Sequence, residues 1–143
     1  MGLLKDKDRD RLRQVFSQMG NRVNLVFFSQ SMECMYCRET RSLLTEISDL
    51  SDKIHLEVFD FGKDTDIAKK YKVDKIPATI VMGENDYGIR FLGIPSGHEF
   101  TTLIDVIMHV SRRDPGFSPE TVKLISQIKQ PIHLQVMISP TWI

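Results

Sequence analysis

The sequence has few cysteines, no excess charge of either sign and no long apolar run. Two cysteines in 143 residues are too few for the disulfide framework of a small secreted protein. The 19 basic and 19 acidic side chains cancel, so the chain lacks the positive charge typical of nucleic-acid-binding proteins. No apolar run approaches the roughly 20 residues that span a bilayer, and the first residues lack a signal-peptide pattern. We therefore expect a cytoplasmic protein that binds neither nucleic acid nor membrane.

The composition is that of a globular domain. Hydrophobic residues make up 41% of the chain and charged residues 27%, which excludes intrinsic disorder as the main state. The length lies within the commonest range for one domain, roughly 100–150 residues. A chain of this size buries enough apolar surface to form a core without disulfide or metal cross-links.

The spacing of apolar residues predicts alternating helices and strands. Strands are predicted at residues 23–28, 54–60, 76–82, 87–92 and 132–138. Helices are predicted at residues 5–19, 35–50 and 65–71, after a Ser96–Glu99 capping box, and from Ser118 with proline at its first position.

The order of these elements predicts an α/β fold. A strand–helix–strand crossover makes the first two strands parallel neighbours. The turn composition of residues 83–86 makes the next two strands an antiparallel hairpin. We predict a four-stranded mixed sheet flanked by helices, with an extra N-terminal helix and a C-terminal extension of one helix and one strand. The break at residues 112–116 divides the chain into a unit over 1–113 and an extension over 114–143.

The two cysteines stand three positions apart, as Cys34-Met35-Tyr36-Cys37, between a predicted strand and a predicted helix. The thiolate is the reactive form of cysteine, and a helix N-terminus lowers the thiol pKa. This placement predicts that Cys34 attacks a partner disulfide and that Cys37 resolves the mixed disulfide. A tetrahedral zinc site needs two further ligands, and the four histidines are scattered singly, so no metal is expected. Two core cysteines at chance spacing, or half of an intermolecular metal site, are the alternatives.

A wider pattern resembles the thioredoxin/glutaredoxin fold. The Cys34–Cys37 motif is followed about forty residues later by Ile76-Pro77-Ala78-Thr79, then by a hairpin and a capped helix. The resemblance implies that Pro77 is cis and faces the disulfide, and that the backbone of Ile76 pairs with an extended substrate peptide. Tyr36 would shape access to the site. The redox-active disulfide would be the only redox group, with no other cofactor.

Three segments narrow the resemblance. Residues 2–8, 71–79 and 91–100 resemble the N-terminal unit of glutaredoxin-like protein disulfide oxidoreductases, which carry two such units in tandem. Residues 131–141 then resemble the first strand of the second unit, and 132–137 share the strand pattern of 23–28. Trp142 stands where a second CxxC would begin, so one redox site is expected instead of two. We expect the chain to be either a fragment of a longer protein or a naturally shortened one. We expect residues 132–138 to dock onto a partner chain, giving a homo-oligomer, or onto the sheet edge.

The resemblance implies a dithiol–disulfide oxidoreductase that acts on protein disulfides. Its partner for reduction would be an NADPH-dependent enzyme similar to thioredoxin reductase. The alternatives are an electron-relay domain for a peroxidase system, a glutathione-dependent iron–sulfur carrier, and a scaffold or fragment whose redox site is idle. The buried carboxylate of thioredoxins is replaced here by Phe28, so their proton relay is not expected. The direction of electron flow depends on a reduction potential that the sequence does not determine.

Overall fold

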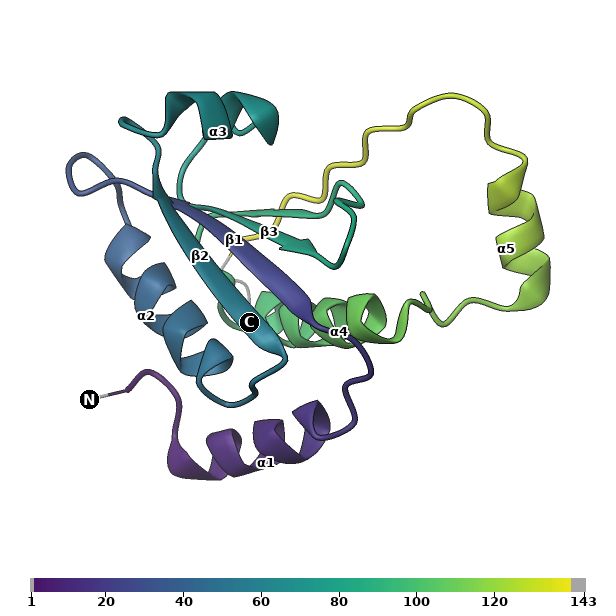
Figure 1. Cartoon of the computed structure of the whole chain (residues 1–143), viewed down its shortest axis with the longest axis horizontal. Coiled ribbons are helices and arrows are strands. Elements are labelled where there is room, and N and C mark those ends of the chain that lie inside the picture. The colour runs from purple at the N-terminus through teal and green to yellow at the C-terminus, as the bar shows by residue number, and fades with distance from the viewer. Residues whose placement is uncertain (1, 140–143) are drawn as a thin grey trace.

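The computed structural model describes residues 2–139, which form a four-stranded sheet in the order β2-β1-β3-β4. The strands are β1 (Val23–Ser29), β2 (Ile54–Asp60), β3 (Ala78–Met82) and β4 (Arg90–Leu92). β1 pairs with β2 in parallel and with β3 antiparallel, and β3 pairs with β4 antiparallel. The predicted mixed sheet, with its parallel first pair and antiparallel hairpin, is confirmed (Figure 1).

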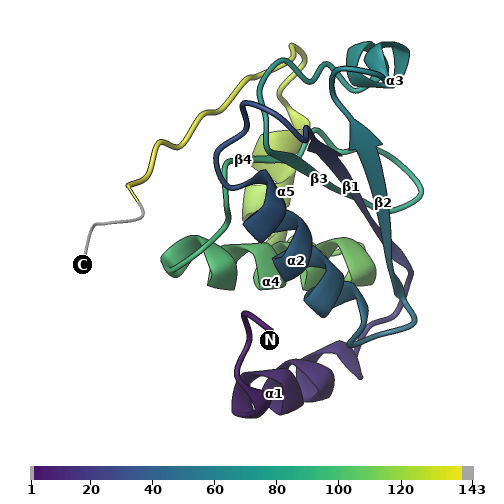
Figure 2. The ribbon, with the colours of Figure 1, turned by 90° about the vertical axis from the view of Figure 1, so that its left-hand side faces the viewer.

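Helices cover both faces of the sheet. The helices of residues 2–139 are α1 (Asp6–Phe16), α2 (Cys37–Ser48), α3 (Thr65–Lys70), α4 (His98–Arg112) and α5 (Pro119–Ser126). Figure 2 shows α2 and α4 on one side of the sheet and α3 on the other, with α1 beyond the end of the sheet. None of these helices, within residues 2–139, is long and apolar enough to cross a membrane.

β1 is buried on both faces, which explains its almost unbroken apolar run. Because side chains alternate along a strand, Leu25 and Phe27 join the core beneath α1, α2 and α4. Val26 and Phe28 join a second cluster beneath α3. All four are buried, so the strand that carries the cysteine loop is held from both sides.

Glu46 of α2 anchors the N-terminal segment. Its carboxylate accepts hydrogen bonds from the backbone N–H groups of Leu3 and Leu4 and forms an ion pair with Arg9 of α1, whose Nη2 lies 2.9 Å from Glu46 Oε2. Burial alone would raise the pKa of Glu46, but the hydrogen bonds from Leu3, Leu4 and Arg9 together lower it below its ordinary value. The ionised carboxylate therefore stabilises the folded state.

We expect Glu46→Gln to lower the free energy of unfolding at pH 7 by on the order of 1 kcal/mol, because part of this anchor lies near solvent. Since the folded pKa lies below the unfolded one, the contribution is present above the unfolded value and is lost as pH falls through the folded value. Urea unfolding at pH 7 and pH 3 measures this, with Glu120→Gln on exposed α5 as the control. A difference from wild type that is equally large at pH 3 would contradict the assignment.

The predicted starts of one helix and one strand are wrong, and in both places a glycine has a positive φ. The N-cap of α4 is Gly97, with φ of 63° and no side-chain capping bond, so the Ser96–Glu99 capping box does not form. The positive φ turns the chain into the helix one residue late, which leaves the Ser96 side chain outside the first turn. The returning strand begins at Arg90 and not at residue 87, because Gly88 has φ of 86° and its N–H bonds to Asp86 Oδ1 at 2.9 Å.

The strand predicted at residues 132–138 is not formed. This segment has no regular secondary structure, and its side chains are exposed, with Leu134 and Val136 at 86% and 87%. Docking onto the sheet edge of its own chain is therefore wrong, because an isolated extended segment has no neighbouring backbone to bond to. α5 does form as predicted, with Ser118 Oγ accepting from Thr121 N, but it has no buried residue. Trp142 lies outside the described residues.

Candidate redox site

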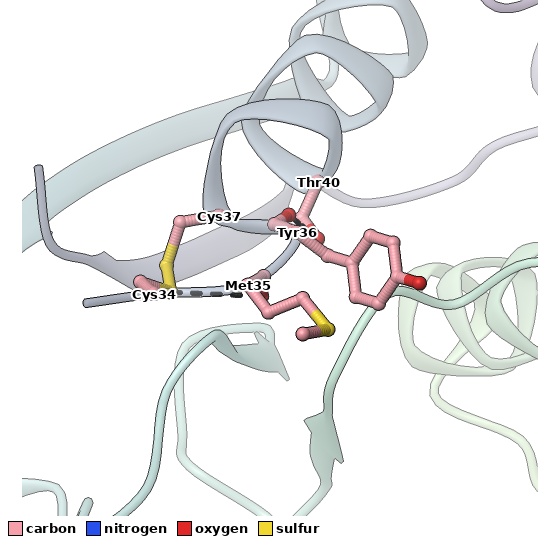
Figure 3. The surroundings of a disulfide bond; sticks show 5 residues. All are labelled: Cys34, Met35, Tyr36, Cys37 and Thr40. Atoms are coloured by element: carbon pink, nitrogen blue, oxygen red, sulfur yellow. Dashed lines mark hydrogen bonds between the residues drawn. A yellow bond between two sulfur atoms is a disulfide. The ribbon is translucent and has the colours of Figure 1, made fainter. Parts of the chain in front are cut away.

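Cys34 and Cys37 form a disulfide in the loop that joins β1 to α2 (Figure 3). Their Cα atoms lie 5.6 Å apart, within the usual range for a disulfide. The helix begins at Cys37 and not near residue 35 as predicted, so Cys34 precedes the first turn by three residues. In the reduced protein both sulfurs would lie near the unpaired N–H groups at this helix end, which favour the thiolate.

The two sulfur-bearing residues differ in exposure. Cys37 is 3% exposed, whereas Cys34 is partly exposed. Cys34 Sγ lies 3.8 Å from the carbonyl oxygen of Met35. A disulfide sulfur has no proton to donate, so this contact becomes a weak hydrogen bond only after reduction. Cys34 is therefore the more accessible residue of the pair.

Thr40 holds the loop at the start of α2, and this residue was missed in the sequence. Its buried hydroxyl donates to the carbonyl oxygen of Tyr36 at 2.6 Å, and its backbone N–H donates to the same oxygen at 2.9 Å. A threonine four residues after a loop residue can make this back-bond, which is the signal that could have found it. The backbone of Tyr36 has the left-handed conformation, with φ of 67°. Its ring points away from the disulfide in Figure 3.

Pro77 lies at the same end of the sheet as the cysteine loop. β3 begins at Ala78, which is the antiparallel partner of Phe28 in β1, and β1 leads directly into the loop. The Ile76–Pro77 bond is cis, Pro77 is buried, and its carbonyl oxygen accepts from Gly93 N at 2.8 Å. Within residues 2–139, the N–H and C=O of Ile76 have no hydrogen-bond partner. The backbone groups of Ile76 are therefore unpaired in the described part of the chain.

The surface around the disulfide is apolar and adaptable. Met32 and Met35 are 72% and 75% exposed, and Tyr36 is 51% exposed. Methionine side chains fit varied apolar partners because they are flexible and polarisable. A larger groove of about 580 Å³ lies between the β3–β4 turn, the end of α4 and α5, and none of its lining residues belongs to the cysteine loop. The methionine surface, and not this groove, adjoins the reactive pair.

A polar cavity of about 340 Å³ adjoins the other side of the loop, where the parallel strands β1 and β2 end. Its two carboxylates already accept backbone hydrogen bonds: Asp60 Oδ1 from Gly62 and Lys63, and Asp64 Oδ2 from Asp60. No group of three or more metal-ligating side chains occurs in the described part of the chain. These acidic residues therefore serve the turn before α3.

Phe28, at the end of β1, is part of an aromatic cluster. It is fully buried, and its ring centroid lies 5.6 Å from that of Phe59 and 6.2 Å from that of Tyr71. An aromatic cluster cannot accept a proton from a cysteine thiol. Phe28 therefore supplies no proton acceptor beneath the loop.

Comparisons with known proteins agree with this geometry. No protein-family model matches the chain. The chain is 31% identical over 133 residues to the AhpF component of the alkyl hydroperoxide reductase of Staphylococcus aureus (strain Mu50), a match that covers 93% of this chain and 24% of that protein. The protein disulfide oxidoreductase of Aeropyrum pernix K1 superposes with a TM-score of 0.79 at 26% identity, over 87% of this chain and 55% of that one.

A second solved structure gives the same result. The NTD_N/C domain of alkylhydroperoxide reductase AhpF from Enterococcus faecalis superposes with a TM-score of 0.77 at 27% identity, over 85% of this chain and 59% of that one. The chain spans about a quarter of the length of the curated relative that it matches. The chain thus has the thioredoxin fold and is similar to the N-terminal unit of larger disulfide oxidoreductases of the AhpF and protein disulfide oxidoreductase type.

Proposed function

We propose that the protein is a thiol–disulfide oxidoreductase that exchanges electrons with protein disulfides through Cys34 and Cys37. The observation that carries this proposal is the disulfide at the N-terminus of α2, with one cysteine partly exposed and the other buried. The Cys34–Cys37 pair is the chain's own two-electron redox group. The similarity to a protein disulfide oxidoreductase supports the same chemistry.

The exchange proceeds in two balanced steps. In the reduced protein the Cys34 thiolate attacks one sulfur of the partner's disulfide, which forms a mixed disulfide and releases the partner's other sulfur as a thiolate. Cys37 then loses its proton and attacks Cys34 Sγ, which forms the Cys34–Cys37 bond and releases the partner's second thiolate. The partner gains two electrons and, at neutral pH, takes up two protons. The protein loses two electrons and, because Cys34 starts as the thiolate, one proton from Cys37, so the second proton comes from solvent. Because Phe28 is apolar, solvent and the departing thiolates carry these protons.

Backbone pairing and apolar contact would hold the partner during this exchange. The open N–H and C=O of Ile76, beside buried Pro77, are placed to bond to an extended segment on one side of the partner's cysteine. Exposed Tyr36 and Met35 would contact the flanking side chains. Backbone pairing carries little sequence preference, so specificity would come from these flanking contacts.

A narrower role within this chemistry is an electron relay between a reductase and a peroxidase. It is favoured by the similarity to alkyl hydroperoxide reductase AhpF over 93% of the chain. The electron donor would then be a flavin-containing reductase domain or an NADPH-dependent enzyme similar to thioredoxin reductase, and the acceptor a peroxidase disulfide. Fast exchange with one cognate peroxidase and slow exchange with insulin or other generic disulfides would identify this role.

A glutathione redox titration tests the proposal. The protein is equilibrated across buffers of defined potential, and its free thiols are alkylated and counted by mass. We expect one two-electron transition, and a midpoint below about −200 mV would identify a reductant, whereas a higher one would identify an oxidant or isomerase. Met35→Leu retains both cysteines and serves as a control that must still titrate. Cysteines that never interconvert would overturn the proposal in favour of an idle scaffold.

A further inference from the structure

The exposed C-terminal segment repeats the sequence of an edge strand. Residues 132–136 read Ile-His-Leu-Gln-Val, and residues 54–58 in β2 read Ile-His-Leu-Glu-Val, so four of the five positions are identical. The match of residues 132–136 to β2 is closer than their match to β1, with which they share only the apolar pattern. A sequence that forms one strand of this sheet therefore occurs a second time, in a segment that has no strand partner.

β2 has a free edge that could receive such a strand. It is the outermost strand of the sheet and, among residues 2–139, pairs only with β1. Its seven residues equal the length of the 132–138 segment. Leu56 and Val58 pack against the main core from a partly buried position, while His55 and Glu57 face solvent. The ends of this edge are occupied: Ile54 N–H bonds to Ser51 O, and Asp60 bonds to the turn before α3, through its N–H to Asp64 Oδ2 and through its C=O to Lys63 N and Asp64 N. Among residues 2–139, the outer backbone groups of β2 are thus available from the C=O of Ile54 to Val58.

The 132–138 segment has the alternation that this edge requires. Its exposed apolar side chains recur at every second position, and they are Ile132, Leu134, Val136 and Ile138. In an extended conformation these four side chains lie on one face. The intervening His133 and Gln135 lie on the other face, as His55 and Glu57 do in β2.

The segment lies far from the β2 edge of its own chain. α5 precedes it and lines a groove with Tyr87 and Ile89 of the β3–β4 hairpin, at the edge of the sheet opposite to β2. Figure 2 shows β2 on the right-hand side and the yellow segment extending to the left, away from the sheet. A second copy can present its β2 edge without this constraint.

We propose that residues 132–138 of one copy add to the outer edge of β2 of a second copy, in parallel and in register, and that the exchange is reciprocal and forms a dimer. In this register Ile132 lies beside Ile54 and Leu134 beside Leu56, so apolar side chains meet on one face. Gln135 lies beside Glu57, and this single difference between the repeats avoids two carboxylates in direct opposition, which would be unfavourable.

The segment brings exposed apolar surface to the contact. Ile132, Leu134, Val136 and Ile138 are 60%, 86%, 87% and 53% exposed, and in this register the partly buried Leu56 and Val58 of β2 lie beside Leu134 and Val136. Removing aliphatic surface of this kind from water favours association.

Sedimentation velocity of the full chain over a range of concentrations tests the oligomeric state. We expect a dimer for the wild type and a monomer for at least one of Leu134→Pro and Gln135→Pro. Successive N–H groups of a strand point to opposite sides, so one of these two prolines must remove a hydrogen bond to β2. Neither substitution touches the core, because both side chains are exposed, and an unchanged circular dichroism spectrum confirms folding.

The contact between positions 57 and 135 tests the register. Gln135→Glu places two carboxylates side by side, and with two such contacts per dimer we expect the dissociation constant to rise about 2- to 30-fold. Gln135→Lys should tighten the dimer by a similar factor. The double variant Glu57→Gln/Gln135→Glu should restore the wild-type constant, which a general effect of charge at the tail would not do.

Three results would overturn the proposal. A wild-type monomer at all concentrations excludes the second copy. A monomer in which hydrogen exchange at the amides of 132–138 is slowed shows that the segment binds within its own chain. A dimer that survives both prolines must be formed by another surface, such as the groove beside α5.

Discussion

Replacing Cys34 by serine abolishes exchange with protein disulfides, whereas replacing Cys37 by serine allows the first step and stops the second. A serine hydroxyl without a base to activate it does not attack a disulfide at neutral pH, so we expect Cys34→Ser to lower the rate by more than ~10³-fold. In Cys37→Ser the exposed Cys34 still attacks, but no neighbouring thiolate resolves the mixed disulfide. Non-reducing mass spectrometry after mixing reduced variant with a disulfide substrate should therefore show a covalent complex only for Cys37→Ser.

The reason for these unequal roles is the unequal burial of the two residues. Cys37 is the first residue of α2 and is 3% exposed, so a folded partner protein has little access to its sulfur. Ser31→Ala in the same loop is the matched control and should leave the exchange rate unchanged. A covalent complex formed by Cys34→Ser and not by Cys37→Ser would reverse the assignment.

Replacing Phe27 by alanine removes about 3–5 kcal/mol from the free energy of unfolding. Phe27 is fully buried in the central strand β1, between Val58 of β2 and Thr79 of β3. The substitution loses the transfer free energy of the ring. It also leaves a cavity beneath α2 and α4, and this cavity can close only in part. Urea unfolding at pH 7, monitored by circular dichroism, measures the loss directly.

Val136→Ala is the matched control for Phe27→Ala. Val136 is 87% exposed in a segment without regular structure, so the same type of truncation should change the unfolding free energy of the monomer by less than about 0.5 kcal/mol. Both variants are measured at concentrations below any dimerisation. A loss under 1 kcal/mol for Phe27→Ala would mean that β1 is not the centre of the core.

The local sequence pattern predicted the strands and helices that depend on burial. β1 is an apolar run because both of its faces are covered, and β2 alternates because one face meets solvent for most of its length. The order of apolar and polar residues along a strand reflects how many of its faces are covered, so these strands could be predicted from the sequence. The cysteine pair could also be predicted, because the spacing of a CxxC motif between a strand and a helix is typical of a redox site.

Backbone conformations with positive φ were not visible in the sequence. Gly97 shifted the start of α4, and Gly88 shortened the returning strand. Tyr36 adopts the left-handed region although its side chain disfavours it, because Thr40 and the disulfide hold the loop on both sides. Contacts between residues impose these positive-φ conformations, and the conformational preferences of single residues do not predict them.

The sequence by itself determined the apolar pattern of the strands and where the two thiols stand, because both depend on local pattern. Only the tertiary structure decided which strand ends meet: antiparallel pairing of Phe28 with Ala78 brings Pro77 to the end of the sheet that carries Cys34. It also decided that residues 132–138 form no strand within this chain, although their pattern is that of β2. A strand exists only where another backbone supplies its hydrogen bonds, and that partner is a property of three-dimensional arrangement.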